Sequence, residues 1–175
     1  MEYRIALADL DRGVEASETA IVARHPSETQ ERLVLRVLTW CLLWEPRLAF
    51  GPGLCDPEAP DLVARDLTGR VTKWVECGSA SPEKLRKAVQ HNAGAEVHAV
   101  FGDARRRDEL RDALAGWKRA DDVSLWLLDG KLVSGLAARD QHRHKWTVTI
   151  VGDHLYVDDG ESARDGAIER SGRRK

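Results

Sequence analysis

Hydrophobic and polar positions alternate in two short segments near the start of the chain. The alternation is regular over residues 2–10 and weaker over residues 16–23, and turn-forming residues occupy positions 9–13 between the two segments. A period of two on both sides of a turn predicts a pair of antiparallel strands.

A long apolar segment follows, because residues 33–44 are polar at only two positions. Ser27 and Gln30, three residues apart, have the form of a capping box, so we expect a helix that starts at Ser27 and ends before Pro46. A helix that is apolar on nearly every side is expected to lie inside the domain.

The later pattern predicts alternating strands and helices. In chain order these are a loop at 46–60, a hairpin at 61–77, a helix from Ser81 to about Asn92, a strand at 97–101, a helix at 106–117, a strand at 123–128 and a hairpin at 146–157. Strand, helix and strand in succession favour a parallel crossover. We therefore expect an α/β domain over residues 1–158, with a mixed sheet flanked by helices. Residues 159–175, charged and without periodicity, are predicted to form a loose tail.

Composition indicates the class of protein. The 175 residues are 42% hydrophobic and 32% charged, as is usual for one soluble globular domain. No apolar run approaches the ~18 residues that span a membrane, and the first residues lack the pattern of a signal peptide. Cys41, Cys55 and Cys77 are odd in number and contain no CxxC, which argues against a disulfide framework or zinc site and favours the cytoplasm.

The net charge of −2 is unusual for a dedicated nucleic-acid-binding protein, because phosphate contacts favour a basic surface. Positive charge is concentrated locally at 105–107, 139–145 and 173–175. Such clusters are either solvated surface, which is the commoner case, or a binding patch for nucleic acid.

Glu31 lies on the same stripe as three leucines of the apolar helix. A carboxylate in line with a core stripe needs a cation, a metal ion or backbone donors as a partner. Glu28 lies three residues earlier, on an adjoining face. In the alternative interpretation both acids only favour the helix N-terminus, or pair with Arg24 and Arg32.

Two further carboxylates lie at the open end of the predicted hairpin. If its loop spans residues 67–70, Asp61 faces Glu76 on one side of the sheet, whereas a loop one residue shorter puts them on opposite faces. Facing carboxylates repel each other unless a divalent cation lies between them. Two acids in one hairpin are common by chance, so the pattern is weak on its own.

Lys84 and Lys87 share one face of the helix that follows the acidic strand. Ordinary solvation explains both lysines. Alternatively, one of them reaches back to orient a water molecule or to stabilise charge on a phosphate.

Four segments together resemble the YaeQ family: RHPSETQER at 24–32, GLC at 53–55, WVECG at 74–78 and KLRKA at 84–88. The resemblance extends from the first strand to about Val157. The family is similar in fold to the PD-(D/E)XK nucleases. The resemblance therefore implies a restriction-endonuclease-like core with extra N- and C-terminal antiparallel strands.

The PD-(D/E)XK superfamily places Pro-Asp at the start of one strand and acid-x-Lys at the end of the next. Pro60-Asp61 and Glu76 match the first two elements, whereas Gly78 stands where the lysine is usual. The resemblance then implies a lysine that has migrated to the following helix, with Lys87 as the first choice and Lys84 as the second.

The implied reaction is phosphodiester hydrolysis that depends on Mg²⁺ or Mn²⁺. Asp61, Glu76 and the Cys77 carbonyl would hold the metal, and Glu31, with Glu28 behind it, would join the metal shell directly or through water. The alternative is a non-catalytic regulatory protein that binds nucleic acid or protein on the same scaffold. The acidic charge balance and Gly78 favour that alternative.

Overall fold

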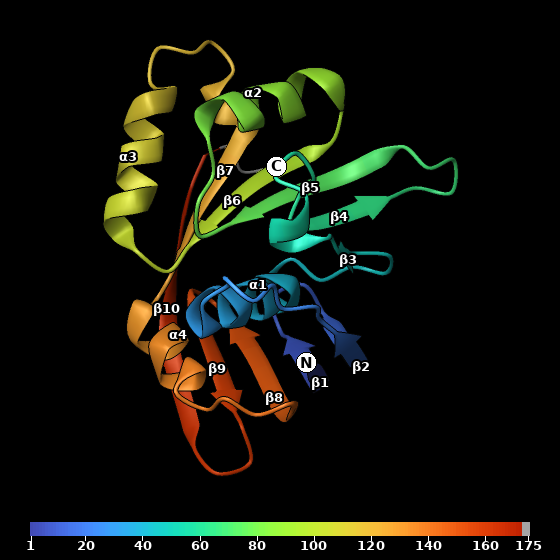
Figure 1. Ribbon diagram of the computed structural model, residues 1–175, viewed down its shortest axis with the longest axis vertical. Helices are drawn as coiled ribbons and strands as arrows, with labels where there is room; N and C mark the ends of the chain where they lie inside the picture. The colour runs from blue at the N-terminus through green and yellow to red at the C-terminus, as the bar shows by residue number, and fades with distance from the viewer. Residues whose placement is uncertain (173–175) are drawn as a thin grey trace.

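The computed structural model describes residues 1–172, which form a mixed sheet flanked by helices, as the pattern predicted (Figure 1). Its strands follow one another in the order β2-β1-β8-β9-β10-β7-β6-β5-β4-β3. Their bounds are β1 (Glu2–Asp9), β2 (Val14–Ile21), β3 (Ala49–Phe50), β4 (Leu62–Arg65), β5 (Val71–Cys77), β6 (Glu96–Phe101), β7 (Val123–Leu128), β8 (Arg143–Val151), β9 (His154–Asp158) and β10 (Ala163–Ser171).

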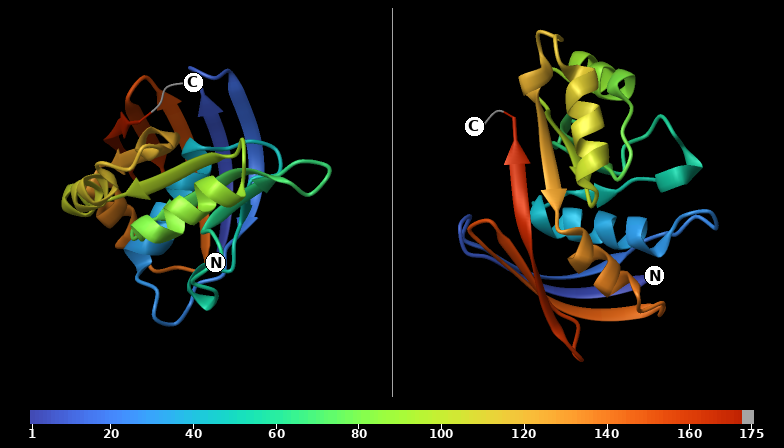
Figure 2. Two further views of the ribbon diagram at one scale, coloured as in Figure 1. Left: turned by 90° about the horizontal axis from the view of Figure 1, so that it is seen from above. Right: turned by 90° about the vertical axis from the view of Figure 1, so that its left-hand side faces the viewer.

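The helices cover the sheet on two sides. They are α1 (Gln30–Leu42), α2 (Pro82–His91), α3 (Ala104–Leu114) and α4 (Gly130–Ala137), with short 3-10 turns at Gly53–Cys55 and Ala120–Asp122. The sheet bends strongly, and α1 lies in the bend with α4 beside it (Figure 2). The larger core surrounds α1, and a smaller core lies between α2, α3 and the outer face of β6 and β7. None of the helices within residues 1–172 combines the length and apolar character needed to cross a membrane.

Helix α1 is internal, as expected, since every residue from 33 to 42 is buried. Its start differs from the prediction. The N-cap is Thr29, whose hydroxyl accepts the Arg32 N–H, whereas the Ser27 hydroxyl hydrogen-bonds to the His25 ring. The helix therefore begins at Gln30, and Glu28 precedes it.

The predicted hairpin at 61–77 is confirmed as β4 and β5. Leu62 pairs with Val75, and this register carried one residue further places Asp61 opposite Glu76. The Asp61 N–H donates to the Val75 carbonyl at 3.0 Å, so the backbone stays aligned beyond β4. A β-bulge between Ala64 and Arg65 shifts the pairing register by one residue next to the turn.

The predicted succession of parallel strands and crossing helices is confirmed. Strands β5, β6 and β7 pair in parallel, and α2 and α3 connect them. Ser81 caps α2 as expected, whereas Asp103 caps α3 and starts it two residues earlier than predicted. The parallel arrangement places the ends of β5 and β6 and the starts of α2 and α3 on one side of the sheet (Figure 1).

The prediction of a loose tail at 159–175 is wrong for residues 163–171, which form β10. Instead, β10 joins the two halves of the sheet, because its first part, Ala163–Ala167, pairs with β9 and its second part, Ile168–Ser171, pairs with β7. Backbone pairing on both sides holds a segment in which only Gly166 and Ile168 are buried. Helix α4, capped by Asp129, was also not predicted. The basic cluster at 173–175 lies outside the described residues.

Candidate functional site

A cleft of about 340 Å³ opens where β4 begins, β5 ends and α2 begins. Asp61, Glu76, Lys84 and Arg32 line it, together with the loop around residues 53–59. Charged side chains from separate parts of the sequence thus share one hollow, and the loop adds Asp56 and Glu58 to them.

Asp61 is almost fully buried at 3% exposure. Its Oδ2 accepts the Cys77 N–H at 2.8 Å, and its Oδ1 accepts from Arg32 Nη2 at 2.6 Å. Arg36 Nε lies 3.7 Å from the same Oδ1. The strand end and two guanidinium groups therefore hold this carboxylate in place.

Glu76 is equally buried, and Lys84 Nζ lies 2.9 Å from its carboxylate. Trp74 Nε1 donates to it at 2.8 Å. Burial raises the pKa of Glu76 to about 7, and the charge of Asp61 acts in the same direction. Lys84 and Trp74 oppose this shift. The carboxylate is therefore poised between its neutral and ionised forms near neutral pH.

The structure brings Lys84, and not the first choice Lys87, to the carboxylates. Lys84 Nζ also donates to the Ala59 carbonyl at 2.7 Å, whereas Lys87 is half exposed and lies 3.4 Å from Glu83. The first turn of α2 is nearest to the end of β5, and Lys87 lies almost a turn further along the helix.

Glu28 and Glu31 also take positions opposite to those expected for them. Glu28 is buried and faces Asp61 across Arg32, whereas Glu31 is exposed and lies on the neighbouring groove. The reason is the start of α1, because Glu28 turns inward before the N-cap while Glu31 occupies the solvent side of the first turn. The expectation that Glu31 lies in line with the core is therefore corrected.

Two arginines hold the acids of the site together: Arg32, which the alternative interpretation had named as a partner of Glu28, and Arg36, which the sequence interpretation did not place there. Arg32 Nη1 lies 2.5 Å from Glu28, and the buried Arg36 lies 3.2 Å from Glu28 and also donates to the Gly51 carbonyl. Burial lowers the pKa of Arg32, but Asp61 and Glu28 outweigh it and raise the pKa above its usual value. The four-residue spacing of Glu28, Arg32 and Arg36 was the available sign in the sequence.

Carboxylate oxygens at the cleft are the kind of donor that divalent cations such as Mg²⁺ take. Within residues 1–172 no three His, Cys, Asp or Glu side chains gather into a metal cage. Mg²⁺ is commonly held by one or two carboxylates, waters and substrate phosphates, and Asp61 and Glu76 supply two carboxylates. Burial raises the pKa of the Cys77 thiol, so the thiol stays protonated and is unsuited as a ligand.

The raised pKa of Glu76 predicts a pH-dependent stability. The folded state holds the Glu76 proton more tightly than the unfolded state, so this contribution is complete below pH 4.5 and is lost as pH rises through about 7. Glu76→Gln mimics the neutral acid. We expect urea unfolding to show that the free energy of unfolding of the variant, relative to that of the wild type, is higher at pH 8 than at pH 5 by on the order of 2 kcal/mol. Identical pH slopes in the two proteins would contradict the assignment.

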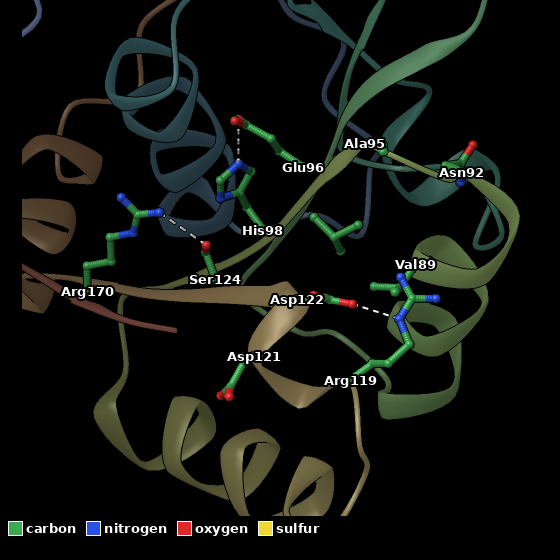
Figure 3. A pocket seen from close by; sticks show the side chains of 12 residues that line it. Val89, Asn92, Ala95, Glu96, His98, Arg119, Asp121, Asp122, Ser124 and Arg170 are labelled. Atoms are coloured by element: carbon green, nitrogen blue, oxygen red, sulfur yellow. Dashed lines mark hydrogen bonds and ion pairs between the residues drawn. The ribbon is translucent and has the colours of Figure 1, made fainter. Parts of the chain in front are cut away.

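A second pocket, of about 240 Å³, lies at the start of β6 and β7 (Figure 3). The cleft lies instead at the end of β5. Its buried His98 accepts from Trp126 Nε1 at 3.1 Å through Nδ1, and Nε2 lies 3.4 Å from Glu96. Burial lowers the pKa of His98, so the ring is neutral near pH 7. Arg170 donates to Ser124 beside it at 3.4 Å. These polar groups satisfy one another, and the sequence pattern did not single them out.

Comparisons of the sequence and of the structure with known proteins give relatives from one family. The family described as YaeQ protein matches residues 1–166. The "Uncharacterized protein YaeQ" of Escherichia coli (strain K12) is 29% identical over 165 residues, covering 90% of this chain and 87% of the relative. The crystal structure of YaeQ protein from Xanthomonas axonopodis pv. citri superposes with a TM-score of 0.88 at 25% identity, covering 98% and 96% of the chains. That from Pseudomonas syringae gives 0.86 at 28% identity, covering 98% and 95%.

Proposed function

The chain belongs to the YaeQ family, and from this premise we propose that its cleft hydrolyses phosphodiester bonds in nucleic acid with the help of Mg²⁺ or Mn²⁺. The proposal treats β4, β5 and α2 as a core of the PD-(D/E)XK type. Asp61 stands at the start of the first strand, Glu76 stands near the end of the second, and the lysine comes from the following helix.

The contact between Lys84 and Glu76 carries the proposal. An amine 2.9 Å from one buried carboxylate, in the same cleft as Asp61, supplies the acid, acid and lysine combination that this chemistry uses. Gly78 stands where the lysine is usual, and its φ of 76° is costly for any residue with a side chain. Migration of the lysine to α2 avoids that cost.

Each group then has a role that its position supports. Asp61, Glu76 and the Cys77 carbonyl would hold the metal, which when bound lowers the pKa of water and polarises the phosphate. Lys84 orients the attacking water or stabilises negative charge on the phosphate. Glu31, exposed as it is, could contribute only through water.

Arg32 must release Asp61 when a cation binds, because it occupies Oδ1 at 2.6 Å. Glu28 remains as its second partner at 2.5 Å, so the guanidinium keeps one ion pair after release. Because Arg32 competes with the cation for Asp61, it lowers the affinity for the metal without abolishing binding.

Calorimetric titration with Mn²⁺ at pH 8 tests the proposal. We expect the wild type to bind Mn²⁺ and Glu76→Gln to bind it at least about 10-fold more weakly, because one carboxylate ligand is lost. Glu83→Gln is the matched control, because Glu83 is exposed at the start of the same helix. Equal affinities in the three proteins would remove the metal from this cleft.

A second candidate function is a non-catalytic binding protein on the same scaffold. The observation that favours it is that Arg32 and Lys84 already pair with Asp61 and Glu76, so these two carboxylates have cationic partners without a metal. Absence of Mn²⁺ binding by the wild type at millimolar concentration, together with retention of an oligonucleotide, would support this candidate.

A further inference from the structure

A second groove, of about 370 Å³, continues from the carboxylate cleft. Arg32, Leu54 and Ser79 line both hollows, so the two form one continuous depression. Glycine residues allow close packing at its base, since a Cβ on Gly130 would lie 2.6 Å from the Gly102 carbonyl oxygen. The depression is therefore longer than one phosphodiester at Asp61 and Glu76 requires.

Arg106 contributes the cation at the far part of this groove. It is exposed, and its Nη1 donates to the carbonyl of Gly78, just beyond β5, at 3.3 Å. Its neighbours in the basic run both form ion pairs, Arg105 with Glu109 and Arg107 with Asp108. Within residues 1–172 Arg106 has no carboxylate partner, so its charge is available to a ligand.

Three acids line the groove, and arginines neutralise one of them, Glu28. Glu28 is paired with Arg32 and Arg36, and the Asp103 carboxylate accepts the Arg105 N–H at the start of α3. Glu31 is exposed and carries a negative charge that opposes an anionic ligand. Within residues 1–172 the groove thus holds one arginine without a carboxylate partner, Arg106, and two exposed acids that keep their charge, Asp103 and Glu31.

Resting on the proposed function, we propose that Arg106 binds the phosphate next to the one that is cleaved, with Arg32 at the junction of the two hollows. The substrate is then a polynucleotide chain and not an isolated phosphodiester. Phosphate contacts beside the reacting group fix the position of a chain and carry no sequence information. Arg106 is accordingly a positioning residue that is independent of the metal ligands.

Fluorescence anisotropy with a labelled short single-stranded oligonucleotide, in Ca²⁺, tests the subsite. We expect Arg106→Ala to weaken binding by about 5- to 10-fold and to reduce the slope of log K against log salt by about 0.7. Arg105→Ala, one residue away and paired with Glu109, is the matched control and should bind like the wild type. Glu31→Gln should bind more tightly. Equal affinities for the two arginine variants would overturn the inference.

Kinetics separate this inference from the proposed function. We expect Arg106→Ala to lower kcat/KM for the oligonucleotide by about 10-fold and to leave the hydrolysis of bis(p-nitrophenyl) phosphate, a single phosphodiester, unchanged. Equal losses on both substrates would contradict a subsite. A wild type that cleaves neither substrate would refute the proposed function, and the anisotropy comparison would still decide the role of Arg106.

Discussion

Arg36→Ala is expected to lower the free energy of unfolding by about 3–5 kcal/mol, because it leaves buried charges without their partner. Arg36 is 1% exposed and lies between Glu28 and Asp61, which are 2% and 3% exposed. Its guanidinium also donates to the carbonyl oxygens of Ala23 and Gly51, so the variant loses backbone contacts as well. Few single substitutions in this chain would strand so many buried polar groups.

Urea denaturation followed by circular dichroism measures this loss. Arg105→Ala removes an arginine from an exposed pair and should change stability by less than about 0.5 kcal/mol. Combining Arg36→Met with Glu28→Gln should recover part of the loss, because an apolar side chain of similar length then meets a neutral partner. A loss below about 1 kcal/mol for Arg36→Ala would show that water replaces the guanidinium.

Lys84→Ala is expected to lower the rate of phosphodiester cleavage by about 100- to 1,000-fold, the usual cost of removing a group that stabilises charge in the transition state. Lys87→Ala should leave the rate within about 2-fold of the wild type, because Lys87 is half exposed and pairs with the exposed Glu83 in solvent. The two variants differ by three positions in one helix, which makes Lys87→Ala a close control.

A pH profile distinguishes a role at the substrate from a merely structural one. Lys84 lowers the pKa of Glu76, so its removal should shift the acidic limb of the profile to higher pH as well as lower the plateau. Measuring rates between pH 6 and pH 9 would show both effects. Similar rates for the two lysine variants would exclude Lys84 from the reaction.

Local patterns were sufficient for most of the fold. Strand alternation, the apolar segment of α1 and the Ser81 cap each depend on neighbouring residues, so they can be read along the chain. For Asp61 and Glu76 the sequence left two registers open, and the structure agrees with the one that places them opposite each other, next to a bulge that the turn residues did not predict. Strand β10 was not predictable, since its polar sequence is held by partners on both sides that lie far away in the chain.

The prediction of the site was limited because the sequence does not show which side chains of a helical turn point toward the site. The choice between Glu28 and Glu31 depends on whether Ser27 or Thr29 caps α1, and a shift of two residues turns side chains by about 200°. The choice between Lys84 and Lys87 depends on how close each turn of α2 lies to β5. Both questions are tertiary, and sequence spacing alone does not answer them.

The pairing of β1 with β8 has a consequence for the order in which the protein folds. Glu2 pairs with Arg143, and within residues 1–172 the segment at Ala163–Ser171 is what joins the two halves of the sheet. Contacts so distant in sequence raise the contact order, and loop closure must precede any gain from them. During synthesis the edge of β1 that pairs with β8 therefore stays unpaired until almost all of the sheet has left the ribosome. An unpaired strand edge can pair with other chains, so this stage of folding carries the greatest risk of aggregation.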